Sequence, residues 1–161
     1  MVIVVFGVTG TGKTRVGSAL AESLGWSFVD ADDFHNDANL AKLKKGVPLD
    51  DADRWPWLAR IRTEIQRYVT QGYNAVVACS ALKRVYRQYL CVSSDVVLVY
   101  LRAEARVLED RLRRRRGHFM NPGLLKSQLD TLEEPTDDTL AVDTARSPAD
   151  IVAIIRKALN L

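Results

Sequence analysis

A glycine-rich segment near the N-terminus carries residues that could hold a triphosphate. It reads Gly7-Val8-Thr9-Gly10-Thr11-Gly12-Lys13-Thr14 and fits the pattern G-x-x-x-x-G-K-[ST]. Glycines let main-chain amides turn toward a phosphate without Cβ collisions, and the helix that follows adds its positive N-terminal end. Lys13 can bridge the outer phosphates, and the Thr14 hydroxyl can ligate Mg²⁺. A plain glycine turn would explain neither residue, so we predict a nucleoside-triphosphate site.

A second group of reactive side chains is the acidic cluster Asp30, Asp32 and Asp33, which follows a short apolar run at 27–29. Ligands collect at the carboxyl ends of parallel strands, so we expect this cluster to lie beside the glycine-rich segment. One carboxylate of the cluster can hold a magnesium-bound water. Another can orient an acceptor hydroxyl and take its proton. By spacing alone, aspartates that merely cap a loop and start a helix are an equally good interpretation.

The elements that must position these residues alternate along the chain. Apolar, β-branched runs predict strands at 2–6, 27–29, 75–79, 96–101 and 140–143. Helical spacing predicts helices at 14–24, 37–45, 51–71, 81–90, 103–115, 124–132 and 148–159. We expect Leu40 and Leu43 to face inward from the second of these, and Ser80 to cap the fourth. The alternation favours an α/β fold with right-handed crossovers and a parallel sheet covered by helices.

Length and composition are typical of one ordinary globular domain, residues 1–161. The chain is 47% hydrophobic and 27% charged, which excludes a disordered or fibrous protein. Its net charge of +3 does not require a polyanionic partner. Cys79 and Cys91 form no C-x-x-C pair and are predicted to be reduced packing residues. The apolar start is too short for a signal peptide or a membrane span, so we expect a cytoplasmic protein with no membrane partner.

Missing motifs narrow the class of nucleotide-binding protein. The chain has no Asn-Lys-x-Asp motif and no glycine preceded by an aspartate three residues earlier, which argues against a switch GTPase. The third predicted strand ends at Ser80 rather than at an aspartate, so it lacks the usual magnesium-binding acid of motor ATPases. What remains is a small kinase.

The chain also resembles a known family, the gluconate kinases of the shikimate-kinase-like P-loop group. The resemblance covers nearly all of the chain and rests on motifs in the right order: residues 7–14, 30–35, 48–58 and 79–87, then Gly117-His118-Phe119, Gln128 and Glu133-Glu134-Pro135. It implies a three-layer P-loop kinase fold with a five-stranded sheet of order 2-3-1-4-5. It also implies a small acceptor-binding lobe at about 35–70, a mobile lid at about 113–125 and a possible homodimer.

The activity that the resemblance implies is transfer of the ATP γ-phosphoryl group to the 6-hydroxyl of gluconate, with Mg²⁺. Lys13, Asp32 and Arg115 would be catalytic, and Thr14 and Asp30 would hold the metal. ATP would contact residues 7–14, with Arg111 stacked on adenine and Arg115 closing over the phosphates. The acceptor would contact the residues Asp32, His35, Arg54, Ser80, Lys83, Arg87, His118 and Gln128.

Several of these residues also have purely structural interpretations. Arg54 could form a surface ion pair with Asp50 or Asp51, and Trp57 is expected to pack in the core. Ser80, Lys83 and Arg87 lie at i, i+3 and i+7, which puts them on one helix face, but this face could simply be solvated.

Two rival functions remain open on the residues alone. The arginine run 113–116, with Arg111, could form a nucleic-acid patch, but no aromatic residues are interleaved with it and we expect no nucleic-acid partner. The two rivals are therefore a kinase of another small hydroxy acid, such as shikimate, and a non-catalytic P-loop module that binds a nucleotide or a nucleic acid.

Overall fold

A parallel β-sheet forms the centre of the protein in a computed structural model, which describes residues 1–114, 122–136 and 139–161. Within these residues the sheet has five strands in the order β2-β3-β1-β4-β5, which confirms the predicted order. The strands are β1 (Val2–Phe6), β2 (Ser27–Asp30), β3 (Ala75–Cys79), β4 (Val96–Arg102) and β5 (Leu140–Asp143).

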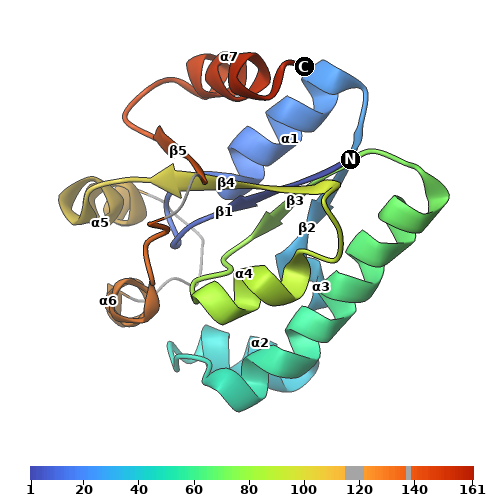
Figure 1. The fold of residues 1–161 in the computed structure, drawn as a ribbon. Helices are drawn as coiled ribbons and strands as arrows, with labels where there is room; N and C mark the ends of the chain where they lie inside the picture. Colours follow the sequence, from blue (N-terminus) through green and yellow to red (C-terminus); the bar gives the residue numbers. More distant parts are fainter. Residues whose placement is uncertain (115–121, 137–138) are drawn as a thin grey trace.

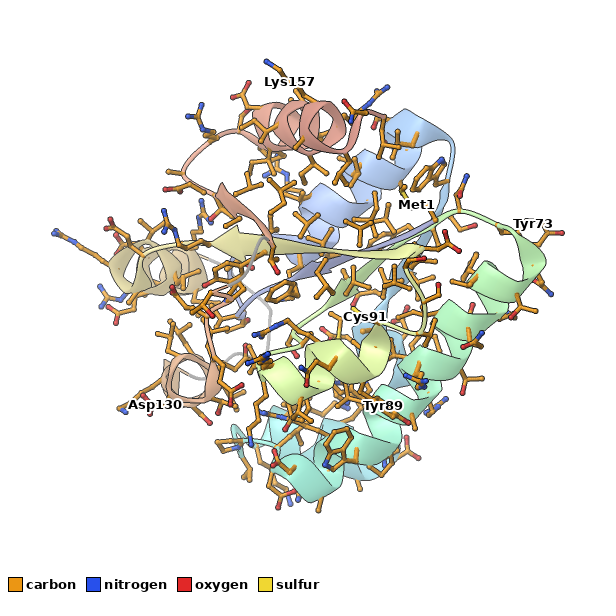
Figure 2. All side chains as sticks on the ribbon, viewed as in Figure 1. Met1, Tyr73, Tyr89, Cys91, Asp130 and Lys157 are labelled. Carbon is orange, nitrogen blue, oxygen red and sulfur yellow. The ribbon has the colours of Figure 1, made fainter. Side chains whose placement is uncertain are left out.

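Helices cover both faces of the sheet and produce the predicted three layers (Figure 1). α1 (Lys13–Leu24) and α7 (Pro148–Leu159) lie on one face, and α3 (Asp51–Gln71) and α4 (Arg84–Leu90) lie on the other. The remaining helical elements border the carboxyl ends of the strands: the short η1 (Ala31–Phe34), α2 (Asp37–Lys44), α5 (Ala105–Arg114) and α6 (Pro122–Thr131). Charged side chains on the outer helices, such as Asp130 on α6 and Lys157 on α7, point away from the sheet (Figure 2).

The first strand is apolar throughout because both of its faces are buried. Val2, Val4 and Phe6 pack toward the layer of α3 and α4, whereas Ile3 and Val5 pack toward α1 and α7. β1 pairs in parallel with β3 and β4, with Val4 opposite Val77 and Leu98. A continuous run of branched residues is what such a doubly covered strand needs. This central position brings the segment after β1 to the middle of the sheet edge.

That segment, residues 7–14, is called the phosphate loop below. Its glycines at 7, 10 and 12 have φ values of 148°, 85° and 89°, in the region that side chains rarely adopt. A Cβ at Gly7 would also lie 2.6 Å from the Leu101 carbonyl oxygen. The loop therefore crosses the end of β4 at a distance that only glycine allows.

Two predictions about helix register were wrong. α4 begins at Arg84, with Lys83 as its N-cap, so Ser80 does not cap it. Residues 80–83 are irregular instead, and Ala81 has a φ of 36°. On α2, Leu40 is 38% exposed, whereas Asn39 is only 2% exposed. The inner side of α2 meets the polar first turn of α3, where a hydrogen-bonding amide is buried more favourably than a leucine.

Other features agree with the sequence. Asp50 caps α3, and Asp53 completes a reciprocal capping box at its start. Cys79, in the core, and Cys91, which is half-buried, are not joined in a disulfide. Among the residues that the structure describes, no helix is long and apolar enough to cross a bilayer. Arg115, His118 and the middle of the predicted lid lie outside the described residues, and the bounds of the acceptor lobe stay a prediction.

Candidate active site

A cleft of about 180 Å³ opens at the carboxyl ends of β1, β2 and β3. The phosphate loop forms one wall, and η1, the start of α3 and one side of α6 form the others. Eleven residues named from the sequence line it: Thr9, Gly10, Gly12, Lys13, Thr14, Asp30, Asp32, His35, Arg54, Ser80 and Gln128. The topology therefore brings together most of the predicted site.

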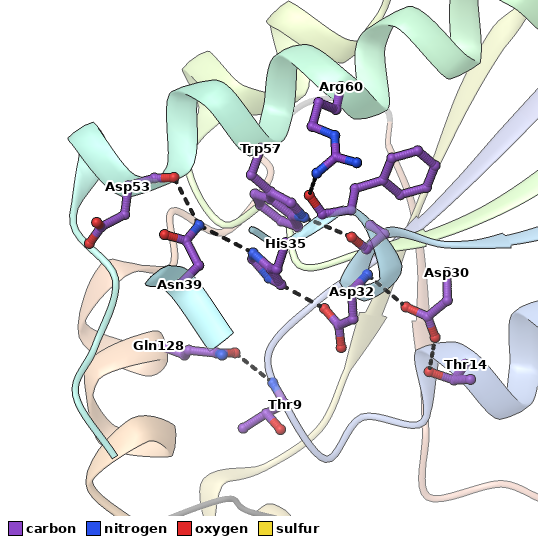
Figure 3. A network of polar contacts seen from close by, with 12 residues as sticks. Thr9, Thr14, Asp30, Asp32, His35, Asn39, Asp53, Trp57, Arg60 and Gln128 are labelled. Atoms are coloured by element: carbon purple, nitrogen blue, oxygen red, sulfur yellow. Dashed lines mark hydrogen bonds and ion pairs between the residues drawn. The ribbon is translucent and has the colours of Figure 1, made fainter. Parts of the chain in front are cut away.

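The phosphate loop is held in shape by its own polar groups. The Thr11 hydroxyl donates to the Val8 carbonyl oxygen at 2.9 Å, and the Lys13 ammonium donates to the same oxygen at 3.0 Å. The Lys13 side chain thus lies along the phosphate loop, and both are predicted to bind the same triphosphate. From the other side, the main-chain N–H of Thr9 donates to Oε1 of Gln128 on α6 at 2.7 Å (Figure 3).

Two oxygen-bearing side chains meet at the start of α1. Thr14 Oγ1 donates to Asp30 Oδ2 at 2.8 Å, and Asp30 Oδ1 accepts from the main-chain N–H of Asp32 at 3.0 Å (Figure 3). A hydroxyl beside a carboxylate is an oxygen donor set of the kind that Mg²⁺ prefers, with the rest of its shell left to water and phosphate. The residues present therefore fit the predicted metal.

Asp32 projects into the cleft from η1, and its side chain is 76% exposed to that open space. Although the side chain is open to the cleft, the pKa of Asp32 is raised above its usual 3.8, mainly because the cleft walls limit the water around the carboxylate and then because Asp30 is near. Lys13 opposes this shift. A carboxylate with a raised pKa is a stronger base than a free aspartate, which suits it to accept a proton from a hydroxyl.

His35 lies beside Asp32, with its Nε2 3.8 Å from Asp32 Oδ1. Its side chain is only 6% exposed because its ring stacks on Trp57, with the centroids 4.6 Å apart and the planes at 12°. Trp57 is held in turn by a 2.7 Å hydrogen bond from its Nε1 to the Ala31 carbonyl oxygen. Burial, helped by the positive charge of Arg54, lowers the pKa of His35, so the ring is neutral near pH 7.

Arg54 reaches the cleft from the first turn of α3. It is 9% exposed, and its guanidinium lies 5.9 Å from the centre of the Tyr86 ring. The carboxylate of Asp51 instead contacts the Lys83 ammonium at 2.8 Å and accepts a hydrogen bond from the Tyr86 hydroxyl. Lys83, and not Arg54, therefore forms the ion pair with Asp51. Arg54 lines the cleft.

The structure does not bring Ser80, Lys83 and Arg87 to one face, because α4 begins later than their spacing suggests. Only Ser80 lines the main cleft. Lys83 lies over a shallower neighbouring opening with Asp51. Arg87 is buried and donates to the carbonyl oxygens of Ala81, Leu82 and Glu133 at 3.1, 2.8 and 2.8 Å. Its contacts fasten the segment before α4 to the chain after α6.

A second pocket, of about 300 Å³, adjoins the phosphate loop on the side of α7. Gly10, Gly12 and Arg15 line both pockets, so the two are neighbours along the loop. Arg111 on α5 borders it, donating to Thr144 Oγ1 at 3.0 Å and also to the Thr144 carbonyl oxygen. Val16, Pro148 and Ile151 add apolar surface to the same pocket. Apolar surface with a few polar groups is typical of pockets that bind a flat heteroaromatic base.

Two residues that support the site have roles that the sequence left open. On the predicted helix 37–45, Asn39 could line the acceptor side or be solvated; in the structure it is buried, with its side-chain nitrogen 3.4 Å from His35 Nδ1. Trp57, expected only in the core, is both buried and part of the cleft wall. One sequence feature indicates how the Asn39 main chain is placed. Asn36 is a favourable N-cap residue, and it caps α2 by accepting a hydrogen bond from the Asn39 main-chain N–H.

Comparison with known proteins agrees with this geometry. Residues 2–135 match the family described as AAA domain. A gluconokinase from Gluconobacter oxydans is 49% identical over 137 residues, covering 84% of this chain and 77% of the relative. The crystal structure of a gluconokinase from Sinorhizobium meliloti is 42% identical and superposes with a TM-score of 0.84, covering 98% and 94% of the two chains. A sugar kinase from Janibacter superposes with a TM-score of 0.91 at 36% identity, covering 99% and 94%.

Proposed function

Because the chain belongs to the gluconokinase family, within the AAA domain family of P-loop proteins, we propose that it transfers the γ-phosphoryl group of ATP to the 6-hydroxyl of D-gluconate. The products are 6-phosphogluconate and ADP. The kinase activity itself follows from the family. The position of the hydroxyl, the metal and the roles of the individual residues are the proposed part.

One observation carries the proposal. Lys13 and Thr14 line one side of the cleft, and Asp32, His35 and Arg54 line the other. Gluconate is a carboxylate with a row of hydroxyl groups, so a pocket for it needs a cation and several hydrogen-bonding side chains. Arg54 offers a planar guanidinium that pairs well with a carboxylate, and Ser80 and His35 offer hydrogen bonds to hydroxyls.

In this mechanism Asp32 orients the acceptor hydroxyl toward the γ-phosphorus and takes its proton as the new oxygen–phosphorus bond forms and the bond from the γ-phosphorus to ADP breaks. Lys13 moves from the Val8 carbonyl oxygen to the outer phosphates, where its charge offsets the charge that develops on the transferred group. Thr14 and Asp30 would hold Mg²⁺, which supplies further positive charge to the phosphates when it is bound. Arg111 would cover the adenine, and the roles predicted for Arg115 and His118 remain part of the proposal.

The test is ADP release from the purified protein with ATP, Mg²⁺ and a panel of acceptors. The panel contains gluconate, two of its epimers, shikimate and nucleoside monophosphates. We expect gluconate to give the highest kcat/KM and NMR of the product to show phosphorus on the 6-oxygen. Comparable turnover of shikimate or of a nucleoside monophosphate would contradict the assignment.

The family resemblance also supports a homodimer and a cytoplasmic location as part of the same proposal. Light scattering on the purified chain at micromolar concentration tests the first of these. A mass of one chain at all concentrations would contradict it.

A further inference from the structure

Two side chains in the acceptor half of the cleft could in principle remove a proton from a hydroxyl, Asp32 and His35. Their nearest polar atoms, Asp32 Oδ1 and His35 Nε2, are 3.8 Å apart, which is too far for a direct hydrogen bond. A substrate oxygen can therefore approach both. Which of them can act as the base depends on where the single proton of the neutral imidazole lies.

The hydrogen bonds of Asn39, which contacts the His35 ring, determine which ring nitrogen carries that proton (Figure 3). The side-chain nitrogen of Asn39 donates to the main-chain carbonyl oxygen of Asp53 at 3.1 Å. A carbonyl oxygen can only accept, so the amide nitrogen of Asn39, and not its oxygen, must face this side. The second hydrogen on the same nitrogen is then directed at His35 Nδ1, 3.4 Å away.

An imidazole nitrogen that accepts a hydrogen bond carries no proton. With Nδ1 as acceptor, a neutral His35 must carry its hydrogen on Nε2, which is the atom on the side of Asp32 and the cleft. The ring cannot rotate away from this arrangement freely, because it is stacked on Trp57 and almost fully buried.

The side chain of Asn39 is held firmly enough to select the tautomer of His35. It is 2% exposed, and its amide bridges α2 to the first turn of α3. The neighbouring Lys42–Asp53 ion pair, at 2.7 Å, joins the same two helices. A buried amide bound at two points loses little further freedom when it orients another side chain.

We infer that Asn39 is a positioning residue for phosphoryl transfer: it fixes His35 as the Nε2–H tautomer, so that His35 presents a hydrogen-bond donor to the acceptor and only Asp32 presents a proton acceptor. His35 then binds an oxygen lone pair of the acceptor, either of a hydroxyl or of a carboxylate, and is not the general base. This inference rests on the proposed kinase reaction for its consequence, but the tautomer is a property of the free protein.

The decisive measurement is the ¹⁵N NMR spectrum of the imidazole groups in the unliganded protein near pH 7.5. The chain has two histidines, His35 and His118, so a His118→Gln variant leaves one ring to assign. We expect His35 Nδ1 at the position of an unprotonated nitrogen and Nε2 at that of a protonated one. A protonated Nδ1 in the neutral ring would overturn the inference, whichever sugar acid proves to be the substrate.

Variants at Asn39 then connect the tautomer to the reaction. In Asn39→Asp a carboxylate replaces the donor, so the proton should move to Nδ1. In Asn39→Leu no group remains to select a tautomer, and the ¹⁵N signals should move toward the average of the two forms. For both variants we expect the acceptor KM to rise about tenfold, the scale of one lost hydrogen bond in a desolvated site, while the KM for ATP stays within about twofold.

Asn36→Ala is the matched control. It removes the cap of α2 and should lower the melting temperature, but it keeps the Asn39 amide and therefore the tautomer and the acceptor KM. If Asn36→Ala raised the acceptor KM as much as Asn39→Leu did, the role of Asn39 would be structural only. Unchanged ¹⁵N signals in folded Asn39→Asp would also refute the inference. If the Asn39 variants do not fold, the ¹⁵N spectrum of His35 in the protein that keeps Asn39 still tests the tautomer.

Discussion

The side-chain oxygen of Gln128 accepts a hydrogen bond from the main-chain N–H of Thr9 at 2.7 Å, across 119 residues of sequence. This contact joins α6 to the phosphate loop at the boundary between the two halves of the cleft. Val8, Leu108 and Leu125 form a small apolar cluster next to it. The position of α6 is thus coupled to the loop that receives the triphosphate.

Replacing Gln128 by leucine should weaken the use of ATP without unfolding the protein. The Thr9 N–H loses its partner, and α6 keeps only the apolar contacts to the loop. We expect kcat/KM for ATP to fall about tenfold, equivalent to about 1.4 kcal/mol, when it is measured at saturating gluconate. Lys126→Ala, an exposed change on the same helix, is the control and should retain full activity. Equal behaviour of the two variants would contradict the coupling.

Asp32→Asn should affect turnover far more than nucleotide affinity. The amide keeps the size of the side chain but cannot take the proton of the acceptor hydroxyl. We expect kcat to drop by about 10²- to 10⁴-fold, with the Kd of an ATP analogue nearly unchanged by calorimetry. The neighbouring Asp33→Asn removes the same charge from η1 and should stay active. Parallel losses of turnover and nucleotide affinity in Asp32→Asn would argue against a base.

Arg87 and Lys83 should behave differently on substitution, although both were predicted to bind the acceptor. Arg87→Ala removes a buried side chain that donates to three carbonyl oxygens, of which only the Leu82 oxygen keeps another donor, the Glu133 N–H, and we expect it to cost about 3 kcal/mol of unfolding free energy. Lys83→Ala breaks an exposed ion pair and should change stability much less. Urea denaturation compares the two variants. A stable Arg87→Ala with a raised gluconate KM would instead support its predicted binding role.

The Lys42–Asp53 ion pair should make stability depend on pH in a defined way. The hydrogen bond from Lys42 holds the pKa of Asp53 below its usual 3.8, and the same contact raises the pKa of Lys42 above 10.5. The ion pair therefore stabilises the folded state at pH values between the usual pKa values of the two groups, where both are charged. This stabilisation is lost as the pH falls through the lowered pKa of Asp53 or rises through the raised pKa of Lys42.

Lys42→Met should accordingly lower the melting temperature at pH 7, and the difference from the unsubstituted chain should vanish once the pH has fallen through the lowered pKa of Asp53. Lys44→Met, on the exposed side of the same helix, should show little effect at any of these pH values. A melting-temperature difference that does not shrink as Asp53 is protonated would mean that Lys42 acts through packing of its carbon chain.

The positions of the strands, the phosphate loop and the start of α3 could all be predicted from local sequence patterns, whereas the strand order was implied by the family resemblance. Each of the first three depends on residues that are close together in the chain: a run of branched residues in β1, three glycines with a following lysine, and Asp50 with Asp53. Such local patterns limit the backbone directly, because they work through sterics and short-range hydrogen bonds. The family resemblance then indicated which residues would face the acceptor.

Only the tertiary structure decided which polar side chains share the cleft and which are used to hold it together. Spacing placed Lys83 and Arg87 beside Ser80, but the irregular segment 80–83 turned one toward Asp51 and the other into the interior. Helical spacing also predicted that Leu40 faces inward, but in the structure Leu40 is exposed and Asn39 is buried. The physical reason is that the cost of burying a polar group depends on the partner it meets, and those partners, the Asp53 carbonyl oxygen and His35 Nδ1, arrive from another helix and another loop.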